Sequence, residues 1–167
     1  MVDRGTGLAP AERGVSFAWL LFGALPVLLI YLAANAIWDA NEAFYVETPR
    51  QMVLSGDYVS PTFNAEPRHN KPVLSYWIVA GLYQLFGISV GVERFGIALG
   101  ALGILAATFL LGRALRSTAT GILAALIIVT APRFVMFSRR IFIDIYITLF
   151  MALGLACFAL AERHPER

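Results

Sequence analysis

The chain has 167 residues, of which 59% are hydrophobic and 14% are charged, and its formal net charge is +2. Soluble domains are typically ~45–50% apolar and ~25% charged, so this composition excludes an ordinary soluble domain. It also excludes a disordered chain, because so apolar a sequence cannot remain solvated. The small net charge does not indicate nucleic-acid binding. The one cysteine, Cys157, permits no internal disulfide. The composition therefore predicts an integral membrane protein.

The first predicted element is a transmembrane helix over residues 17–37. This apolar run of about 21 residues is long enough to cross a hydrocarbon layer of ~30 Å at ~1.5 Å per residue. Residues 1–16 contain two arginines and are expected to form a cytoplasmic tail. The segment Ala34-Asn35-Ala36 resembles a signal-peptide cleavage site, but the apolar run is longer than such peptides use. We favour a retained membrane helix.

The segment that follows is polar and has two helix start signals. Asp39 and Glu42 have the spacing of a capping box, which indicates a short helix at the membrane exit. Thr48 before Pro49 repeats the signal and predicts a second short helix that ends at Gly56. These helices would make the loop structured. If the two acids only cap the helix, they need no catalytic role. This structural interpretation competes with a catalytic one.

A second apolar run covers residues 73–86. At about 14 residues and ~1.5 Å per residue it is too short to span a bilayer comfortably, so it predicts an interfacial helix. Lys71 immediately precedes this run, and its ammonium group would lie at the depth of lipid phosphates. Counting the run as a span is the alternative, and it would give five spans.

Three further apolar runs cover residues 95–111, 119–132 and 141–161, and each is expected to cross the membrane. Asp144 lies in the last run, four positions after Arg140, so on a helix the two side chains would share a face. A carboxylate one turn inside a membrane span is costly unless it is paired or functional. The structural alternative is that Arg140 and Asp144 form an ion pair that neutralises both charges and has no functional role.

We therefore predict an all-α polytopic membrane protein with about four transmembrane helices and short juxtamembrane helices in the first outer loop. The predicted order is an inner tail, a first span, an outer loop, three more spans and a second inner tail: residues 1–16, 17–37, 38–94, 95–161 and 162–167. Of the 13 lysines and arginines, six would lie inside and seven outside. Only their higher density inside supports this orientation.

The basic residues expected on the outer side are the unusual feature. Arg133, Arg139 and Arg140 crowd the short connection between the last two spans, on the face that normally has few positive charges. This arrangement indicates an anionic ligand.

Several short motifs point to a known family. They are the runs 38–52, Ser55-Gly56-Asp57, Asn70-Lys71-Pro72, Tyr76-Trp77 and Leu85-Phe86-Gly87. Together they resemble the amino-terminal region of polyprenyl-phosphate-dependent glycosyltransferases of family 39. This family belongs to the multi-spanning GT-C class and includes protein O-mannosyltransferases and bacterial aminoarabinose transferases. The resemblance covers roughly residues 38–161.

The resemblance implies an enzyme that moves a sugar from a polyprenyl phosphate to a hydroxyl of a lipid, glycan or protein acceptor. The reaction would take place on the periplasmic or extracellular face of the plasma membrane. Carboxylates near the acceptor would remove its proton, and cations would stabilise the departing phosphate. The expected catalytic residues are Asp39, Glu42 and Asp144, and the expected phosphate-binding residues are Lys71, Arg68, Arg139 and Arg140. These acids must lie on one membrane face, which four spans allow and five do not.

The sequence departs from the family pattern at the acidic motif. Asn41 precedes Glu42 where relatives show adjacent Asp and Glu, and Asn70 precedes Lys71 where an acid is common. Asp39 could substitute for the missing acid if the segment is extended, and we favour Asp39 and Glu42 acting together. The same carboxylates could instead bind a divalent metal ion.

Two other interpretations remain open. The chain could be an amino-terminal portion of a larger enzyme, since the family has many more spans. It could also be a non-catalytic lipid-phosphate-binding or transporter-like membrane protein that uses the same charged groups.

Overall fold

The computed structural model describes residues 10–30, 37 and 40–163. Its helices are α1 (Pro10–Leu29), α2 (Ala40–Ser55), α3 (Val73–Phe86), α4 (Val90–Leu115), α5 (Thr118–Thr130), α6 (Pro132–Phe137) and α7 (Asp144–Arg163). Its strands are β1 (Thr62–Phe63) and β2 (Glu66–Pro67), which pair antiparallel. The predicted all-α class is confirmed, apart from this small hairpin.

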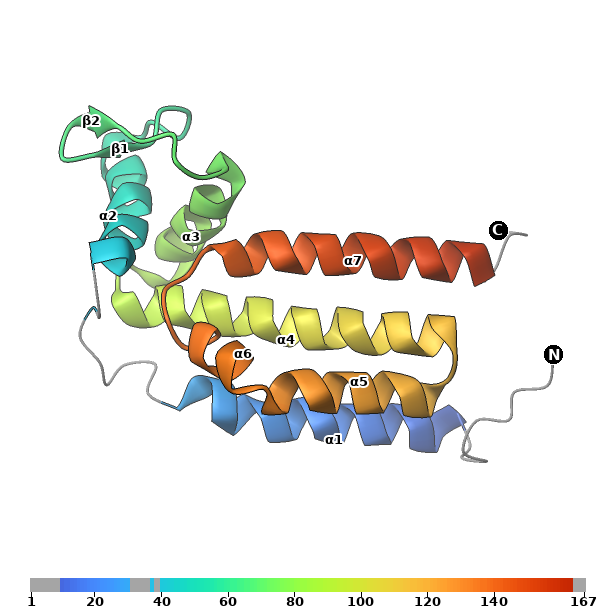
Figure 1. Ribbon diagram of the computed structural model, residues 1–167. Coiled ribbons are helices and arrows are strands. Elements are labelled where there is room, and N and C mark those ends of the chain that lie inside the picture. Colours follow the sequence, from blue (N-terminus) through green and yellow to red (C-terminus); the bar gives the residue numbers. More distant parts are fainter. Residues whose placement is uncertain (1–9, 31–36, 38–39, 164–167) are drawn as a thin grey trace.

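Four helices, α1, α4, α5 and α7, run side by side (Figure 1). Helices α2 and α3 and the hairpin lie at one end of this bundle, where α4 and α7 begin (Figure 1). We call this the α2–α3 end. Helices α1 and α5 run toward it, whereas α4 and α7 run away from it, so the α4–α5 connection lies at the opposite end (Figure 1).

Two helices carry the membrane character of the described part of the chain. Helices α4 and α7 are the two that are both long and apolar enough to cross a membrane. Helix α4 packs against α1, α3, α5 and α7 and is half buried, whereas only 17% of the most apolar stretch of α7 is buried inside the molecule. Large apolar side chains such as Met151, Leu155 and Phe158 are exposed on α7. This exposure is what a lipid-facing helix requires.

The connection between α4 and α5 is short and tightly packed. The side chain of Ser117 caps α5 by accepting a hydrogen bond from the Thr120 amide. A Cβ atom on Gly112 would lie 2.8 Å from the Cα of Gly121. The two helices therefore approach so closely that only glycine fits at these positions.

Three predicted elements differ from the structure. The predicted first span, residues 17–37, differs in its bounds from helix α1, which begins at Pro10 and ends at Leu29; residues 31–36 lie outside the described part. Proline is favoured at the first helical position, so the helix starts before the apolar run does. The fourth run, residues 119–132, forms helix α5, which ends at Thr130, slightly before the predicted end, because Pro132 begins the separate helix α6.

The third difference is in α2, where we predicted two short helices. The structure has one continuous helix with Pro49 inside it, and Thr48 is buried instead of capping a new helix. A single proline removes one backbone N–H donor and need not end a helix that is held by packing. The predicted end of α2 is confirmed, since Gly56 follows Ser55 with a φ of 75°.

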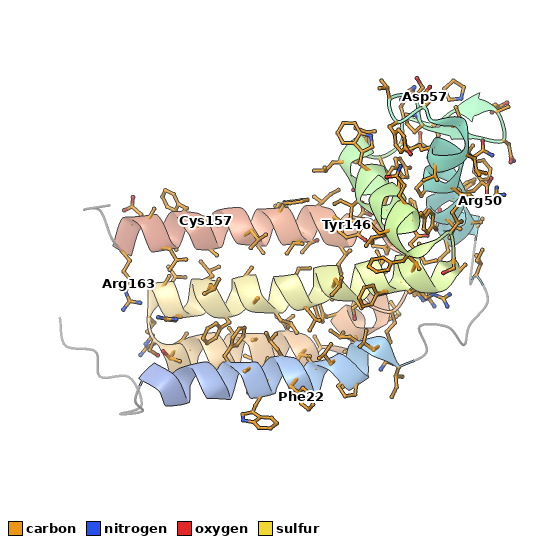
Figure 2. The ribbon with its side chains drawn as sticks, turned by 180° about the vertical axis from the view of Figure 1, so that it is seen from behind. Phe22, Arg50, Asp57, Tyr146, Cys157 and Arg163 are labelled. Atoms are coloured by element: carbon orange, nitrogen blue, oxygen red, sulfur yellow. The ribbon has the colours of Figure 1, made fainter. Side chains whose placement is uncertain are left out.

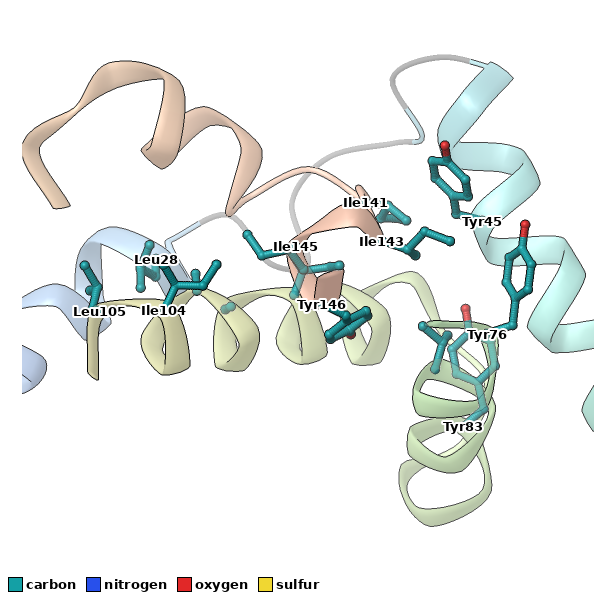
Figure 3. Packing of buried hydrophobic residues seen from close by; sticks show 14 of the residues in the cluster. Leu28, Tyr45, Tyr76, Tyr83, Ile104, Leu105, Ile141, Ile143, Ile145 and Tyr146 are labelled. Atoms are coloured by element: carbon teal, nitrogen blue, oxygen red, sulfur yellow. The ribbon is translucent and has the colours of Figure 1, made fainter. Parts of the chain in front are cut away.

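The bounds of α3 are those predicted, Val73–Phe86. Helix α3 does not run along the bundle but is steeply inclined to it (Figure 1). Its buried face includes Tyr76 and Tyr83, which belong to the main apolar cluster together with Leu105, Ile141 and Ile143 (Figure 3). The core therefore extends from the bundle into the α2–α3 end.

Candidate functional site

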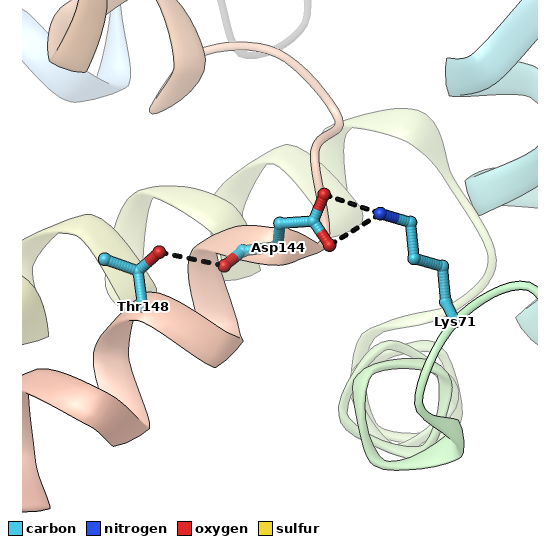
Figure 4. Close-up of polar contacts among 3 residues, drawn as sticks. All are labelled: Lys71, Asp144 and Thr148. Atoms are coloured by element: carbon cyan, nitrogen blue, oxygen red, sulfur yellow. Dashed lines mark hydrogen bonds and ion pairs between the residues drawn. The ribbon is translucent and has the colours of Figure 1, made fainter.

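The main polar contact at the α2–α3 end joins Lys71 to Asp144. The Lys71 ammonium donates to both Asp144 carboxylate oxygens, each at 2.7 Å (Figure 4). Lys71 lies just before α3, and Asp144 is the first residue of α7. The two predicted residues are therefore brought together from segments far apart in the sequence. Both side chains are about one-quarter exposed.

The position of Asp144 corrects two predictions. The carboxylate is not one turn inside a helix but at the helix start, where it interacts favourably with the helix dipole. Arg140 lies before α7, in the connection that follows α6, so the helical four-residue spacing between Arg140 and Asp144 does not apply. The ion pair that the structure records for Asp144 is with Lys71.

The surroundings of Lys71 reinforce its positive charge. Hydrogen bonding to Asp144 raises the pKa of Lys71 above its ordinary value. The ammonium also lies 6.0 Å from the ring centre of Tyr45 and 5.8 Å from that of Phe142. Aromatic faces attract cations at this range. Lys71 is therefore held as a cation at the rim of the site.

Arg68 directly follows strand β2, at the base of the hairpin. Its backbone N–H donates to the carbonyl of Pro61 at 2.7 Å, and its guanidinium carbon lies 3.8 Å from the ring centre of Phe44. Among the described residues, neither the Nε of Arg68 nor the hydroxyl of Tyr76 has a hydrogen-bond partner. An unsatisfied buried donor costs roughly 1–3 kcal/mol.

Glu42 is buried, with 2% of its surface exposed. One carboxylate oxygen accepts a hydrogen bond from the Ile141 amide at 3.2 Å, and the other lies 3.7 Å from a guanidinium nitrogen of Arg94. Glu42 thus connects α2 to α4 and to the segment that leads into Asp144. The arrangement fixes that segment relative to Lys71.

Sequence reasoning missed the charged groups at the start of α4. Glu93 and Arg94 are fully buried, and the hydroxyl of Tyr83 donates to Glu93 at 2.7 Å. Two adjacent charges at the edge of an apolar run were the available signal, because buried charges need partners. They tie α3 and α2 to α4.

The remaining predicted residues are placed differently. Arg139 donates through two guanidinium nitrogens to the carbonyl of Val27, in the last turn of α1. This contact satisfies a carbonyl that the helix end leaves without a partner. Arg140 lies in the same connection. Asp39 lies outside the described residues.

The topological requirement for a shared site is met for the described acids. Helices α4 and α5 separate Glu42 from Asp144 and run in opposite directions (Figure 1). Both acids therefore lie at the α2–α3 end, where side chains of several elements converge (Figure 2). Within the described part of the chain, no three metal-ligating side chains lie together; because Asp39 is outside that part, the possible divalent metal site stays a prediction.

Comparisons with known proteins show the family of the chain. Residues 16–167 match the family described as dolichyl-phosphate-mannose-protein mannosyltransferase. An uncharacterized protein of Aquifex aeolicus (strain VF5) is 36% identical over 137 residues, which are 78% of this chain and 27% of the relative. No solved structure matches the chain.

Two relatives carry a more specific name, undecaprenyl phosphate-alpha-4-amino-4-deoxy-L-arabinose arabinosyl transferase. The protein from Edwardsiella ictaluri (strain 93-146) is 30% identical over 87% of this chain and 27% of the relative. The protein from Pseudomonas paraeruginosa (strain DSM 24068 / PA7) is 31% identical over 70% of this chain and 21% of the relative. The chain thus spans about a quarter of the length of these relatives. The match over residues 16–167 confirms the resemblance to glycosyltransferase family 39, and the chain belongs to the dolichyl-phosphate-mannose-protein mannosyltransferase family.

Proposed function

We propose that this chain forms the donor-phosphate part of a membrane glycosyltransferase that uses a polyprenyl-phosphate-linked sugar. Family membership and the names of two relatives support this chemistry. The observation that carries the proposal is the meeting of Lys71 and Asp144 at 2.7 Å. A cation held at the bundle end, in reach of solvent, is suited to a lipid phosphate.

In the proposed reaction, an acceptor hydroxyl attacks the anomeric carbon of the sugar. The bond between that carbon and the phosphate oxygen breaks, and its electron pair passes to the phosphate. Negative charge therefore grows on the phosphate, where the ammonium of Lys71 would stabilise it. The proton of the acceptor hydroxyl passes to a carboxylate.

We divide the predicted acids by their surroundings. Asp144 acts as a positioning residue, because both its oxygens hold Lys71. The contacts of Glu42 with Ile141 and Arg94 support a positioning role for it as well. Asp39 keeps its predicted role as the base, supported by its proximity in sequence to Glu42.

We divide the predicted cations in the same way. Lys71 and Arg68 are the proposed phosphate contacts. The contact of Arg139 with the Val27 carbonyl supports a role in holding α1 against the connection that leads to Asp144. Arg140 remains a proposed phosphate contact.

We further propose that the α2–α3 end faces the periplasmic or extracellular side of the plasma membrane. The four side-by-side helices, with α5 continued by α6, would be the membrane spans, and α3 would lie in the interface. The inclination of α3 to the bundle (Figure 1) and its length of 14 residues support this arrangement. The acceptor would be a hydroxyl of a lipid, glycan or protein.

Sugar transfer by the full-length protein tests the proposal. Lys71→Ala and Asp144→Asn should each lower transfer from a polyprenyl-phosphate donor by about 100-fold, since removing one charge-stabilising group typically costs ~10²–10³ in kcat. Arg50→Ala is the matched control, because Arg50 is an exposed cation of α2 paired with Glu47. Transfer at the wild-type rate in both test variants, at normal protein levels, would rule out this site. Donor binding without transfer by the wild-type protein would favour a lipid-phosphate-binding function.

A further inference from the structure

Two buried donors beside Lys71 have no partner among the described residues. They are the Nε of Arg68 and the hydroxyl of Tyr76, whose side chain is 0% exposed. Buried polar groups in folded proteins are normally hydrogen-bonded, because leaving water without a replacement partner is unfavourable. A guanidinium can only donate, and a tyrosine hydroxyl close to it still has its own proton to donate. The two groups therefore indicate a position for an acceptor atom that the described residues do not supply.

The two groups are close enough to influence one another. Burial raises the pKa of the Tyr76 hydroxyl, whereas the close approach of the Arg68 side chain to that hydroxyl and the charges of Arg68 and Lys71 lower it. Figure 3 shows Tyr76 in the first turns of α3 and Tyr45 on α2, with their hydroxyl groups pointing the same way. The Lys71 ammonium lies 6.0 Å from the Tyr45 ring centre. The Nε of Arg68, the Tyr76 hydroxyl and the Lys71 ammonium thus belong to one cluster.

The charge balance of the cluster distinguishes Arg68 from Lys71. The charge of Lys71 is matched by Asp144. Within the described ranges, the Arg68 guanidinium contacts aromatic rings, those of Phe44 at 3.8 Å and Phe63 at 5.9 Å, and no carboxylate. Stacking on a ring fixes the guanidinium plane and leaves its edge N–H groups available as donors. The excess positive charge of the cluster is therefore on Arg68.

We infer that Arg68 and Tyr76 together bind one phosphate oxygen of the polyprenyl phosphate, with Lys71 directed at a second oxygen of the same group. This inference rests on the proposed function and adds Tyr76 to it as a donor-binding residue. It also makes Arg68 the cation whose charge is available before the lipid arrives. An anionic oxygen fits better than a sugar hydroxyl, because both groups can donate and the cluster has an excess of positive charge.

The test is the affinity of the full-length protein for a sugar-free polyprenyl phosphate in lipid nanodiscs. Tyr76→Phe, which removes the hydroxyl alone, should raise Kd by about tenfold, and Arg68→Gln by at least as much. Because both groups contact one oxygen, the Kd of the double variant should be only a little higher than that of the single variant that binds more weakly. Thermal stability of Tyr76→Phe without lipid should stay close to that of the wild type, because the hydroxyl makes no well-formed hydrogen bond within the described part of the chain.

Two matched controls come from the same chain. Tyr83→Phe removes a buried hydroxyl from the same helix, but that hydroxyl is bonded to Glu93, so Kd should stay unchanged. Arg50→Gln removes an exposed arginine paired with Glu47 and should also leave Kd unchanged.

Unchanged affinity in both Tyr76→Phe and Arg68→Gln, or independent multiplying effects in the double variant, would overturn the inference. Weaker binding of the sugar-bearing donor alone, with normal binding of the sugar-free lipid, would place the contact on the sugar and also overturn it. These outcomes leave the proposed function intact if Lys71→Ala and Asp144→Asn lower transfer as expected. Normal transfer by those two variants would instead overturn the proposed function.

Discussion

At the scale of single residues, the pairing of Lys71 with Asp144 shows what a sequence can and cannot indicate. Each residue has a local signal: a lysine before an interfacial helix and an acid in an apolar run. Their contact has none, because it joins the start of α3 to the start of α7. Local spacing instead offered an Arg140–Asp144 pair as the structural alternative, and its helical spacing does not apply because the helix begins only at Asp144.

The buried donors of Arg68 and Tyr76 show the same limit, since their proximity has no local signal in the sequence. Arg68 was predicted as a phosphate contact from its charge and position. Tyr76 was not singled out for a role of its own, since an aromatic residue on a helix is usually a packing residue. Only its buried hydroxyl without a partner, next to Arg68, distinguishes it.

The Lys71–Asp144 pair predicts a specific pH dependence. Because the pKa of Lys71 is raised by Asp144, the stabilisation from this pair is fully present below the ordinary pKa of lysine and is lost as the pH rises through the raised pKa. Asp144→Asn should therefore be less stable than the wild type below this pH range and should lose less stability as the pH rises through it, so that the two profiles converge at alkaline pH. Stability scans between about pH 9 and pH 11 would measure this difference.

A control carboxylate is available on α2. Glu47 pairs with Arg50, and arginine does not titrate in this range, so Glu47→Gln should leave the alkaline profile in place. Identical profiles for Asp144→Asn and the wild type would contradict the assigned pair.

At the scale of elements, prediction succeeded where a boundary has its own chemical signal. Helix α3 has the predicted bounds because Pro72 precedes it and Gly87, with a φ of 86°, follows it. Prediction failed where packing overrides the local signal. Helix α2 continues through Pro49, since Glu42, Tyr45 and other buried side chains on both sides hold it in place.

The α4–α5 contact gives a prediction at this scale. In Gly112→Val, a Cβ atom would lie 2.8 Å from the Gly121 backbone, so the helices must separate. This overpacking should lower the free energy of unfolding by roughly 1–3 kcal/mol. Gly154→Ala on α7 is the control: a Cβ there meets nothing within 4 Å, so stability should be unchanged or rise by up to ~1 kcal/mol. Equal thermal stabilities of the two variants would contradict the packing at Gly112.

At the scale of the whole molecule, composition was enough to predict a helical membrane protein, and the order of apolar runs was enough to bring Glu42 and Asp144 to one end. The positive-inside bias could not fix the orientation, because basic residues are divided almost equally between the two ends. Several of the arginines expected outside are used in the fold, as Arg94 and Arg139 are. Their contacts are long-range, so no local pattern distinguishes them from arginines that bind lipid.

The orientation itself is testable by cysteine labelling. In a Cys157→Ala background, cysteines at the exposed positions Trp77 and Arg133 should react with a membrane-impermeant maleimide added from outside. A cysteine at Arg116, in the connection between α4 and α5, should react only after the membrane is permeabilised. Reaction of Arg116→Cys from the same side as Trp77→Cys would contradict the arrangement of the helices across the membrane.

The most direct test of the account is a double-mutant cycle on sugar transfer by the full-length protein, with Lys71→Met and Asp144→Leu. If the two residues act as one unit on the donor phosphate, either substitution removes that unit. The double variant should then be about as slow as each single variant. Independent effects, with a double variant slower by the product of the two single losses, would contradict the claim that this pair forms the donor-phosphate site.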